Sequence, residues 1–140
     1  MAVKIAGMSA PIRVVVADDD PDAVLSLRAL LEDEGYEVKT VTSGPQALDA
    51  VRDFGADVLL LDIGMPLMSG YEVERILRER YASAKPMLIA VTGRQSVHDK
   101  SLAHNTGFDH YVAKPYDPNQ LLGLLRQVGK IRGGANRDPA

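Results

Sequence analysis

The chain of 140 residues contains no cysteine and no tryptophan. Without cysteine, disulfide bonds, thiolate metal sites and cysteine nucleophiles are excluded. No apolar run approaches the roughly 20 residues that a membrane-spanning helix needs. The N-terminal segment MAVKIAGMSAP lacks the apolar core of a signal peptide, so we expect a cytoplasmic location and no contact with membranes.

An excess of basic residues is missing as well. Sixteen Lys and Arg face nineteen Asp and Glu, which gives a formal net charge of −3. A surface that binds nucleic acid needs a basic stripe, so this balance predicts no nucleic-acid partner. With 46% hydrophobic and 25% charged residues, the composition is that of an ordinary globular chain of one domain.

Short apolar segments recur along the chain and alternate with longer amphipathic ones. The more apolar of them are rich in Val, Leu and Ile, which is typical of strands buried on both faces of a parallel sheet. The predicted strands are Ile12–Ala17, Glu37–Val41, Val58–Leu61, Met87–Val91 and Tyr111–Ala113.

Apolar residues at three- and four-residue spacing predict helices between these strands. The predicted helices lie between Asp20 and Gly35, between Ser43 and Gly55, over Gly70–Arg80, over Ser96–Asn105 and from Asp117 onward. This alternation predicts an α/β fold with a five-stranded parallel sheet in the flavodoxin-like (βα)5 order 2-1-3-4-5 and helices on both faces.

We expect one domain over residues 11–128. Residues 1–10 form an N-terminal extension in this interpretation. Residues 129–140 end in GGANRDPA, which has no periodicity, and we expect a flexible tail or linker there.

Ligand sites in such sheets lie beyond the carboxyl ends of the strands. Polar residues follow all five strands at these ends. Thr42 and Ser43 after the second strand are less distinctive, and the others are Asp18 and Asp19, Asp62, Thr92 and Lys114. In the expected strand order the first and third strands are neighbours. The three aspartates should therefore lie close together.

Three neighbouring carboxylates repel one another unless a cation binds or a carboxyl group takes up a proton. Hard oxygen ligands without His or Cys favour Mg²⁺, with Mn²⁺ as a substitute. An aspartate beside Mg²⁺ can accept a phosphoryl group, and Mg²⁺, a lysine and a hydroxyl can each bind one phosphoryl oxygen. The residues therefore favour phosphoryl transfer to a carboxylate.

Four segments, VVVADDDPDA, VLLLDIGMPLMSGYE, LIAVTG and GFDHYVAKPYD, occur in this order over roughly residues 12–128. Together they resemble the receiver domain of response regulators in two-component signalling. Both a single-domain regulator similar to the chemotaxis regulators and the receiver of a hybrid histidine kinase fit this resemblance.

The resemblance implies that Asp62 is the phosphoacceptor and that Thr92 and Lys114 bind the phosphoryl group. It also implies that Thr92 and Tyr111 form the conformational switch and that the Lys114–Pro115 peptide is cis. The implied metal ligands are Asp18 (mainly through water), Asp19, Asp62 and the backbone carbonyl of Gly64.

The implied donor is a histidine kinase or a histidine phosphotransfer protein. Phosphorylation would change the face formed by the fourth helix, fifth strand and fifth helix, and so control binding of a downstream protein. Such a domain assists its own phosphorylation and dephosphorylation but is not an enzyme with a separate substrate. The segment DPNQLLGLLRQV has only Arg126 as a formal charge after Asp117, so we expect a monomer.

Three alternatives remain open at this point. A haloacid-dehalogenase-type phosphatase would use Asp18 as nucleophile with Asp20 nearby. A flavodoxin-like FMN protein would need a phosphate-binding loop after the first strand, where ADDD would repel phosphate. A receiver fold could also serve as a docking module without phosphorylation.

Overall fold

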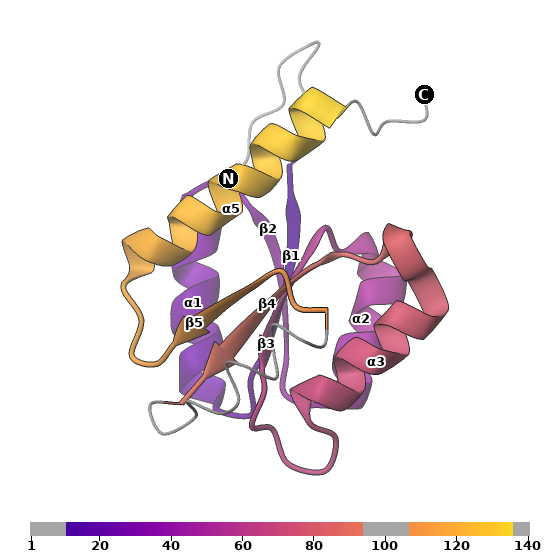
Figure 1. The fold of residues 1–140 in the computed structure, drawn as a ribbon. Coiled ribbons are helices and arrows are strands. Elements are labelled where there is room, and N and C mark those ends of the chain that lie inside the picture. The colour runs from indigo at the N-terminus through magenta and orange to yellow at the C-terminus, as the bar shows by residue number, and fades with distance from the viewer. Residues whose placement is uncertain (1–10, 94–106, 136–140) are drawn as a thin grey trace.

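The sheet of the computed structural model has five parallel strands in the order β2-β1-β3-β4-β5. Residues 11–93 and 107–135 are described (Figure 1). The strands are β1 (Arg13–Ala17), β2 (Glu37–Val41), β3 (Val58–Asp62), β4 (Met87–Thr92) and β5 (His110–Ala113). The predicted fold class and strand order are confirmed, and each strand begins within one residue of its predicted start.

Helices cover both faces of the sheet (Figure 1). On one face lie α1 (Pro21–Asp33) and α5 (Pro118–Ala135). On the other face lie α2 (Gly44–Ala50), which continues into a π-helical turn (Val51–Gly55), and α3 (Gly70–Tyr81), which ends in a 3₁₀ turn (Ala82–Ala84). The helix predicted over Ser96–Asn105 lies outside the described residues.

Side-chain caps start the helices where the sequence predicts. Asp20 accepts a hydrogen bond from the backbone N–H of Asp22 at 3.0 Å, and Ser43 caps α2 in the same way. At α3, Ser69 and Glu72 form a capping box, in which each side chain accepts from the other residue's backbone N–H. These bonds satisfy N–H groups that have no partner within the helix.

Helix α5 extends to Ala135, beyond residue 128, where we expected a flexible tail to begin. The domain bounds and the tail stay predictions. Lys130 to Arg132 are compatible with a helix, and an isolated glycine such as Gly129 costs a helix only about 1 kcal/mol. The glycine pair at 133 and 134 lies in the last turn, so it marks the end of this helix rather than a tail before it.

Alternate residues along the strands face opposite layers of the core. The layer under α2 and α3 contains the strand residues Val15, Ala17, Leu59, Leu61, Leu88 and Ala90. The layer under α1 and α5 contains the strand residues Val14, Val16, Val58, Leu60, Ile89 and Val112. Because both faces of β1, β3 and β4 are buried, these three strands are almost continuously apolar, and this explains the sequence pattern.

The turn that leads into β5 packs directly on α3. The Tyr71 and Phe108 rings meet edge to face with centroids 6.2 Å apart. Gly107 has a φ of +97°, and a Cβ there would collide with Oε2 of the buried Glu74 side chain. Burial raises the pKa of Glu74. The charge of Arg78, whose Nε lies 3.1 Å from Oε2 of Glu74, opposes this rise but does not cancel it.

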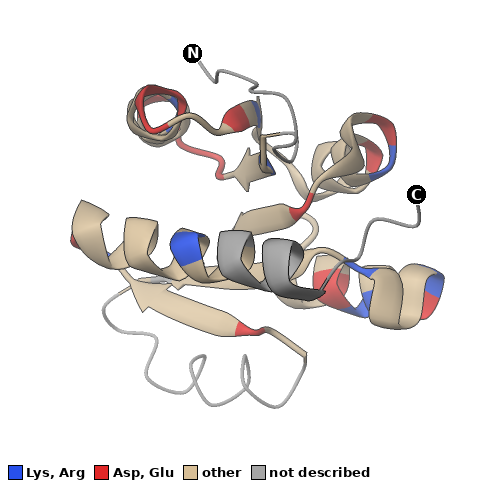
Figure 2. Cartoon of the chain, turned by 90° about the horizontal axis from the view of Figure 1, so that it is seen from above, with Lys and Arg blue, Asp and Glu red and all other residues tan. Residues whose placement is uncertain are grey.

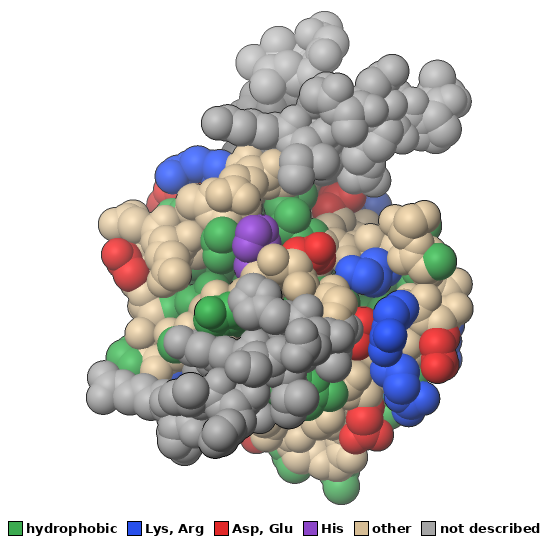
Figure 3. Space-filling view, viewed as in Figure 1, with side chains coloured by type: hydrophobic (Ala, Val, Ile, Leu, Met, Phe, Trp, Pro, Cys, Tyr) green, Lys and Arg blue, Asp and Glu red, His purple; other side chains and the backbone are tan. Residues whose placement is uncertain are grey.

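The described surface carries charges of both signs. Over α3, Arg75 pairs with Glu79 and Arg78 with Glu74, and Figure 3 shows basic and acidic side chains mixed on this side of the molecule. Along α5 as far as Val128, charge is sparse (Figure 2). Among the described helices, none has the length and apolar character needed to cross a membrane.

Gly70, the first residue of α3, packs closely against the backbone that follows β3. Its N–H donates to the carbonyl of Ile63 at 3.0 Å, and a Cβ on Gly70 would lie 2.8 Å from Ile63 Cα. Since the neighbour is backbone, it cannot move aside as a flexible side chain would. Glycine therefore allows the loop after Asp62 to fold back on itself.

We predict that Gly70→Ala lowers the free energy of unfolding by about 1–3 kcal/mol, because the added methyl group overpacks this contact. The matched control is Gly123→Ala in α5, where a Cβ would meet nothing within 4 Å. That change should raise stability by about 0.5–1 kcal/mol through helix propensity. Urea unfolding of both variants checks the pair, and an unchanged midpoint for Gly70→Ala would contradict the prediction.

Candidate phosphoacceptor and metal site

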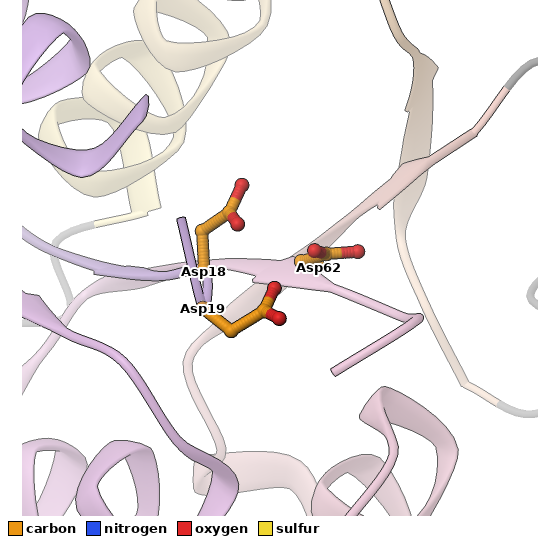
Figure 4. Close-up of side chains that lie close together, drawn as sticks. All are labelled: Asp18, Asp19 and Asp62. Atoms are coloured by element: carbon orange, nitrogen blue, oxygen red, sulfur yellow. The ribbon is translucent and has the colours of Figure 1, made fainter. Parts of the chain in front are cut away.

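Three carboxyl groups meet where β1 and β3 end (Figure 4). Asp18 and Asp19 directly follow β1, and Asp62 is the last residue of β3. Ala17 pairs with Leu61 in the sheet register, which places the two strand ends side by side. One oxygen of each aspartate lies within 4.8 Å of one of each of the others, so the predicted cluster is present.

Lys114 brings a positive charge to this cluster from the end of β5. Its Nζ lies 2.8 Å from Oδ2 of Asp18 and 3.5 Å from Oδ2 of Asp62. Burial acts to lower the pKa of Lys114, but the hydrogen bond to Asp18 and the charge of Asp62 outweigh it and raise the pKa. Lys114 therefore stays protonated at neutral pH.

Asp62 is the carboxyl group whose charge the site disfavours. Its side chain is only 14% exposed, and this burial raises its pKa. The backbone N–H of Gly64 donates to Oδ1 at 3.0 Å and, with Lys114, partly opposes that effect. The charges of Asp18 and Asp19 add to it.

The donor set fits a small divalent cation. The site offers carboxylate oxygens without His or Cys, and its three negative charges face one ammonium group among the described residues. Both Asp18 oxygens are already engaged, one by Lys114 and the other by the backbone N–H of Asp20 at 3.0 Å. Asp19 is exposed. The expected roles, Asp19 as a direct metal ligand and Asp18 as a ligand mainly through water, stay predictions.

Two interactions at the site were not anticipated from the sequence. They are the N–H bonds that Asp20 and Gly64 donate to carboxylates two residues earlier. Both are turns in which an Asp side chain accepts from residue i+2, and the Asp-x-Gly spacing at Asp62 could have indicated the second. The backbone carbonyl of Gly64 as a metal ligand stays a prediction.

The structure places the two expected switch residues on neighbouring strands. Thr92 ends β4 and pairs in register with Ala113, while Tyr111 pairs with Ala90. The half-buried Tyr111 packs against the core layer under α2 and α3. The Lys114–Pro115 peptide is cis, as the resemblance implies. The roles of Thr92 and Tyr111 stay predictions.

The fold and the acidic strand-end site define a doubly wound α/β domain whose site lies at the carboxyl edge of the sheet. The chain matches the response regulator receiver domain over residues 14–126. It therefore belongs to the receiver-domain family of two-component response regulators, and the family resemblance seen in the sequence is confirmed.

Similar proteins include longer regulators and separate receiver structures. The sensory transduction protein RegX3 of Mycolicibacterium smegmatis is 39% identical over 91% of this chain and 54% of its own length. The DNA-binding response regulator MtrA of the same species is 36% identical over 81% of this chain and 49% of its own length. The chain thus spans about half the length of these curated relatives.

Two solved structures show the same architecture. The chemotaxis response regulator CheY4 of Vibrio cholerae superimposes with a TM-score of 0.76 at 28% identity, covering 84% of this chain and 98% of that one. A CheY-like receiver domain protein from Methanospirillum hungatei superimposes with a TM-score of 0.77 at 28% identity, covering 89% of this chain and 98% of that one. Members of this family typically bind Mg²⁺, which the acidic cluster fits.

We predict that Asp62→Asn stabilises the metal-free protein at neutral pH, because it removes a buried charge and its repulsion by Asp18 and Asp19. Since folding raises the pKa of Asp62, the ionised group costs stability above the folded-state pKa. The difference should shrink as the pH falls and both states protonate.

Thermal unfolding between neutral and acid pH measures this effect. Asp33→Asn, a change of an exposed carboxyl group at the far end of α1, is the control and should shift the melting temperature little. A lower melting temperature for Asp62→Asn at neutral pH would show that the charge of Asp62 stabilises the fold instead.

Proposed function

We propose that this receiver domain accepts a phosphoryl group on Asp62 from a histidine kinase or a histidine phosphotransfer protein, in the cytoplasm. The observation that carries the proposal is the position of the Asp62 carboxylate. It lies at a strand end, next to Asp18 and Asp19 and 3.5 Å from the Lys114 ammonium. The anionic nucleophile, Asp62, is thereby held next to a cationic group, Lys114, as phosphoryl transfer requires.

In the proposed transfer, an Asp62 oxygen forms a bond to phosphorus while the bond from phosphorus to the donor's imidazole nitrogen breaks. The electron pair of that bond stays with the imidazole, and Asp62 releases no proton because it reacts as the carboxylate. Lys114 and Thr92 would then bind phosphoryl oxygens. Mg²⁺ held by Asp18, Asp19, Asp62 and the Gly64 carbonyl would neutralise charge on the phosphoryl group.

Phosphorylation would then shift the domain between two conformations. Thr92 would bind the phosphoryl group, and Tyr111 would repack inward and change the surface around β5 and α5. Their positions on adjacent strands support this coupling. A ligand shifts such an equilibrium only by its differential affinity for the two states. The output would be contact with a downstream protein, and the domain itself would be a monomer.

The contacts of Asp18 favour this proposal over a phosphatase that uses Asp18 as nucleophile. Both oxygens of Asp18 accept short hydrogen bonds, from Lys114 at 2.8 Å and from the backbone of Asp20 at 3.0 Å. Attack by either oxygen would cost one of these bonds. Among the described residues, Asp62 accepts a hydrogen bond from the backbone N–H of Gly64 at 3.0 Å, and its contact with Lys114 is longer, at 3.5 Å.

Incubation with Mg²⁺ and acetyl phosphate, followed by intact mass measurement, tests the proposal. We expect the wild type and Asp33→Asn to gain one phosphoryl group and Asp62→Asn to gain none. Asp18→Asn should label more slowly, because the metal site is weakened. Labelling of Asp62→Asn but not Asp18→Asn would favour the phosphatase mechanism, and no labelling of the wild type by any donor would favour a docking module.

The lifetime of the phosphoryl group should depend on residue 64. A Cβ on Gly64 would lie 3.7 Å from Oδ1 of Asp62, an ordinary contact that a side chain can make without strain. We predict that Gly64→Met covers the carboxylate and slows hydrolysis by a factor of a few. Loss of the label after removal of the donor gives the rate, and faster loss in the variant would contradict this shielding.

A further inference from the structure

A cavity of about 550 Å³ opens beside the acidic cluster, on the side of the sheet that α1 and α5 cover. Its apolar lining comes from three strands, with Val16, Leu60 and Val91, and from α1, with Ala23 and Leu27. This volume lies within the range of about 300–1,000 Å³ that is typical of small-molecule sites. The proposed phosphoryl transfer does not use this space.

Polar groups stand at one edge of the cavity. Asp18, Asp20 and Lys114 contribute to its lining, together with the aromatic ring of Tyr116. Lys114 is already paired with Asp18 at 2.8 Å and lies 3.5 Å from Asp62, so its positive charge is directed into the acidic cluster. Asp20 is exposed and has no described ion pair. The edge of the cavity is therefore net negative.

We propose that this cavity binds a small organic cation, a ring-bearing amine, with the ring on the apolar lining and the ammonium group at Asp20. Charge complementarity selects a cation over an anion, because Lys114 and Asp18 already pair with each other and Asp20 has no ion pair among the described residues. Contact between the ring of the amine and the apolar lining of the cavity supplies the remaining affinity.

Binding at this cavity would oppose metal binding at the neighbouring cluster. Asp18 belongs to both the cavity lining and the group of three carboxylates, so a second positive charge there repels the metal. Coupling between two sites is reciprocal, so Mg²⁺ must weaken the binding of the amine by the same factor by which the amine weakens the binding of Mg²⁺. This coupling rests on the metal site of the proposed function, whereas binding of the amine does not.

The test uses the full chain with three probes that share one ring system: tryptamine, indole and indole-3-acetate. Titrations followed by NMR, without Mg²⁺ and without a phosphodonor, should show tryptamine binding about tenfold more tightly than indole, which corresponds to about 1.4 kcal/mol. Indole-3-acetate should bind more weakly still. Equal affinity for all three probes, or no binding by any, would overturn the proposal.

The Ala23→Leu variant tests the location, since a larger side chain there fills the cavity while leucine suits a helix. Tryptamine affinity should fall about tenfold or more. Leu25→Ala, at a position on α1 that is 59% exposed and outside the cavity, is the matched control and should bind like the wild type. Melting temperatures verify that both variants fold, and unchanged tryptamine binding by Ala23→Leu would overturn the proposal.

The effect of Mg²⁺ separates this inference from the proposed function. Tryptamine binding that weakens as Mg²⁺ is added supports the coupling, and binding that ignores Mg²⁺ overturns the coupling. Because the binding titration contains no phosphodonor, a failure of Asp62 to become phosphorylated would leave its result intact. Conversely, normal labelling of Asp62 with no tryptamine binding would refute the cavity proposal alone.

Discussion

Asp18 and Lys114 form an ion pair at 2.8 Å. This pair joins the end of β1 to the end of β5, across β3 and β4, which lie between them in the sheet. Without a cation, the carboxylates that converge at the ends of β1 and β3 would repel one another. Lys114 offsets part of that repulsion. Burial, with the charges of Asp18 and Asp19 added, still raises the pKa of Asp62. The site therefore favours the binding of a further positive charge. Without that charge, the site lowers the stability of the fold.

This arrangement follows from the doubly wound topology. Parallel strands bring their carboxyl ends to one edge, so residues distant in the sequence gather there without any local motif that joins them. The apolar interiors of the same strands hold that edge in place from both sides. Close glycine contacts such as Gly70 on Ile63 then fix the loop that follows the phosphoacceptor candidate.

Much of this could be predicted from the sequence, because strand periodicity, caps and strand-end residues are local signals. Asp20 as a helix cap and the cluster of three aspartates are examples. Other features depend on tertiary contacts that no local pattern encodes. The engagement of both Asp18 oxygens and the cavity under Tyr116 are of this kind. The end of α5 is hard to predict from the sequence because glycines mark helix ends as well as linkers.

The contact between Glu74 and Gly107 links two segments that a designer of hybrid receivers would treat as independent. Exchanging the part of the chain from residue 107 onward for that of a relative without this glycine would import a side chain at position 107. Any side chain there would collide with the Glu74 carboxylate and would also have to adopt a positive φ. Positions 74 and 107 should therefore covary in evolution, and a crossover point for such chimeras belongs before α3 or after Gly107.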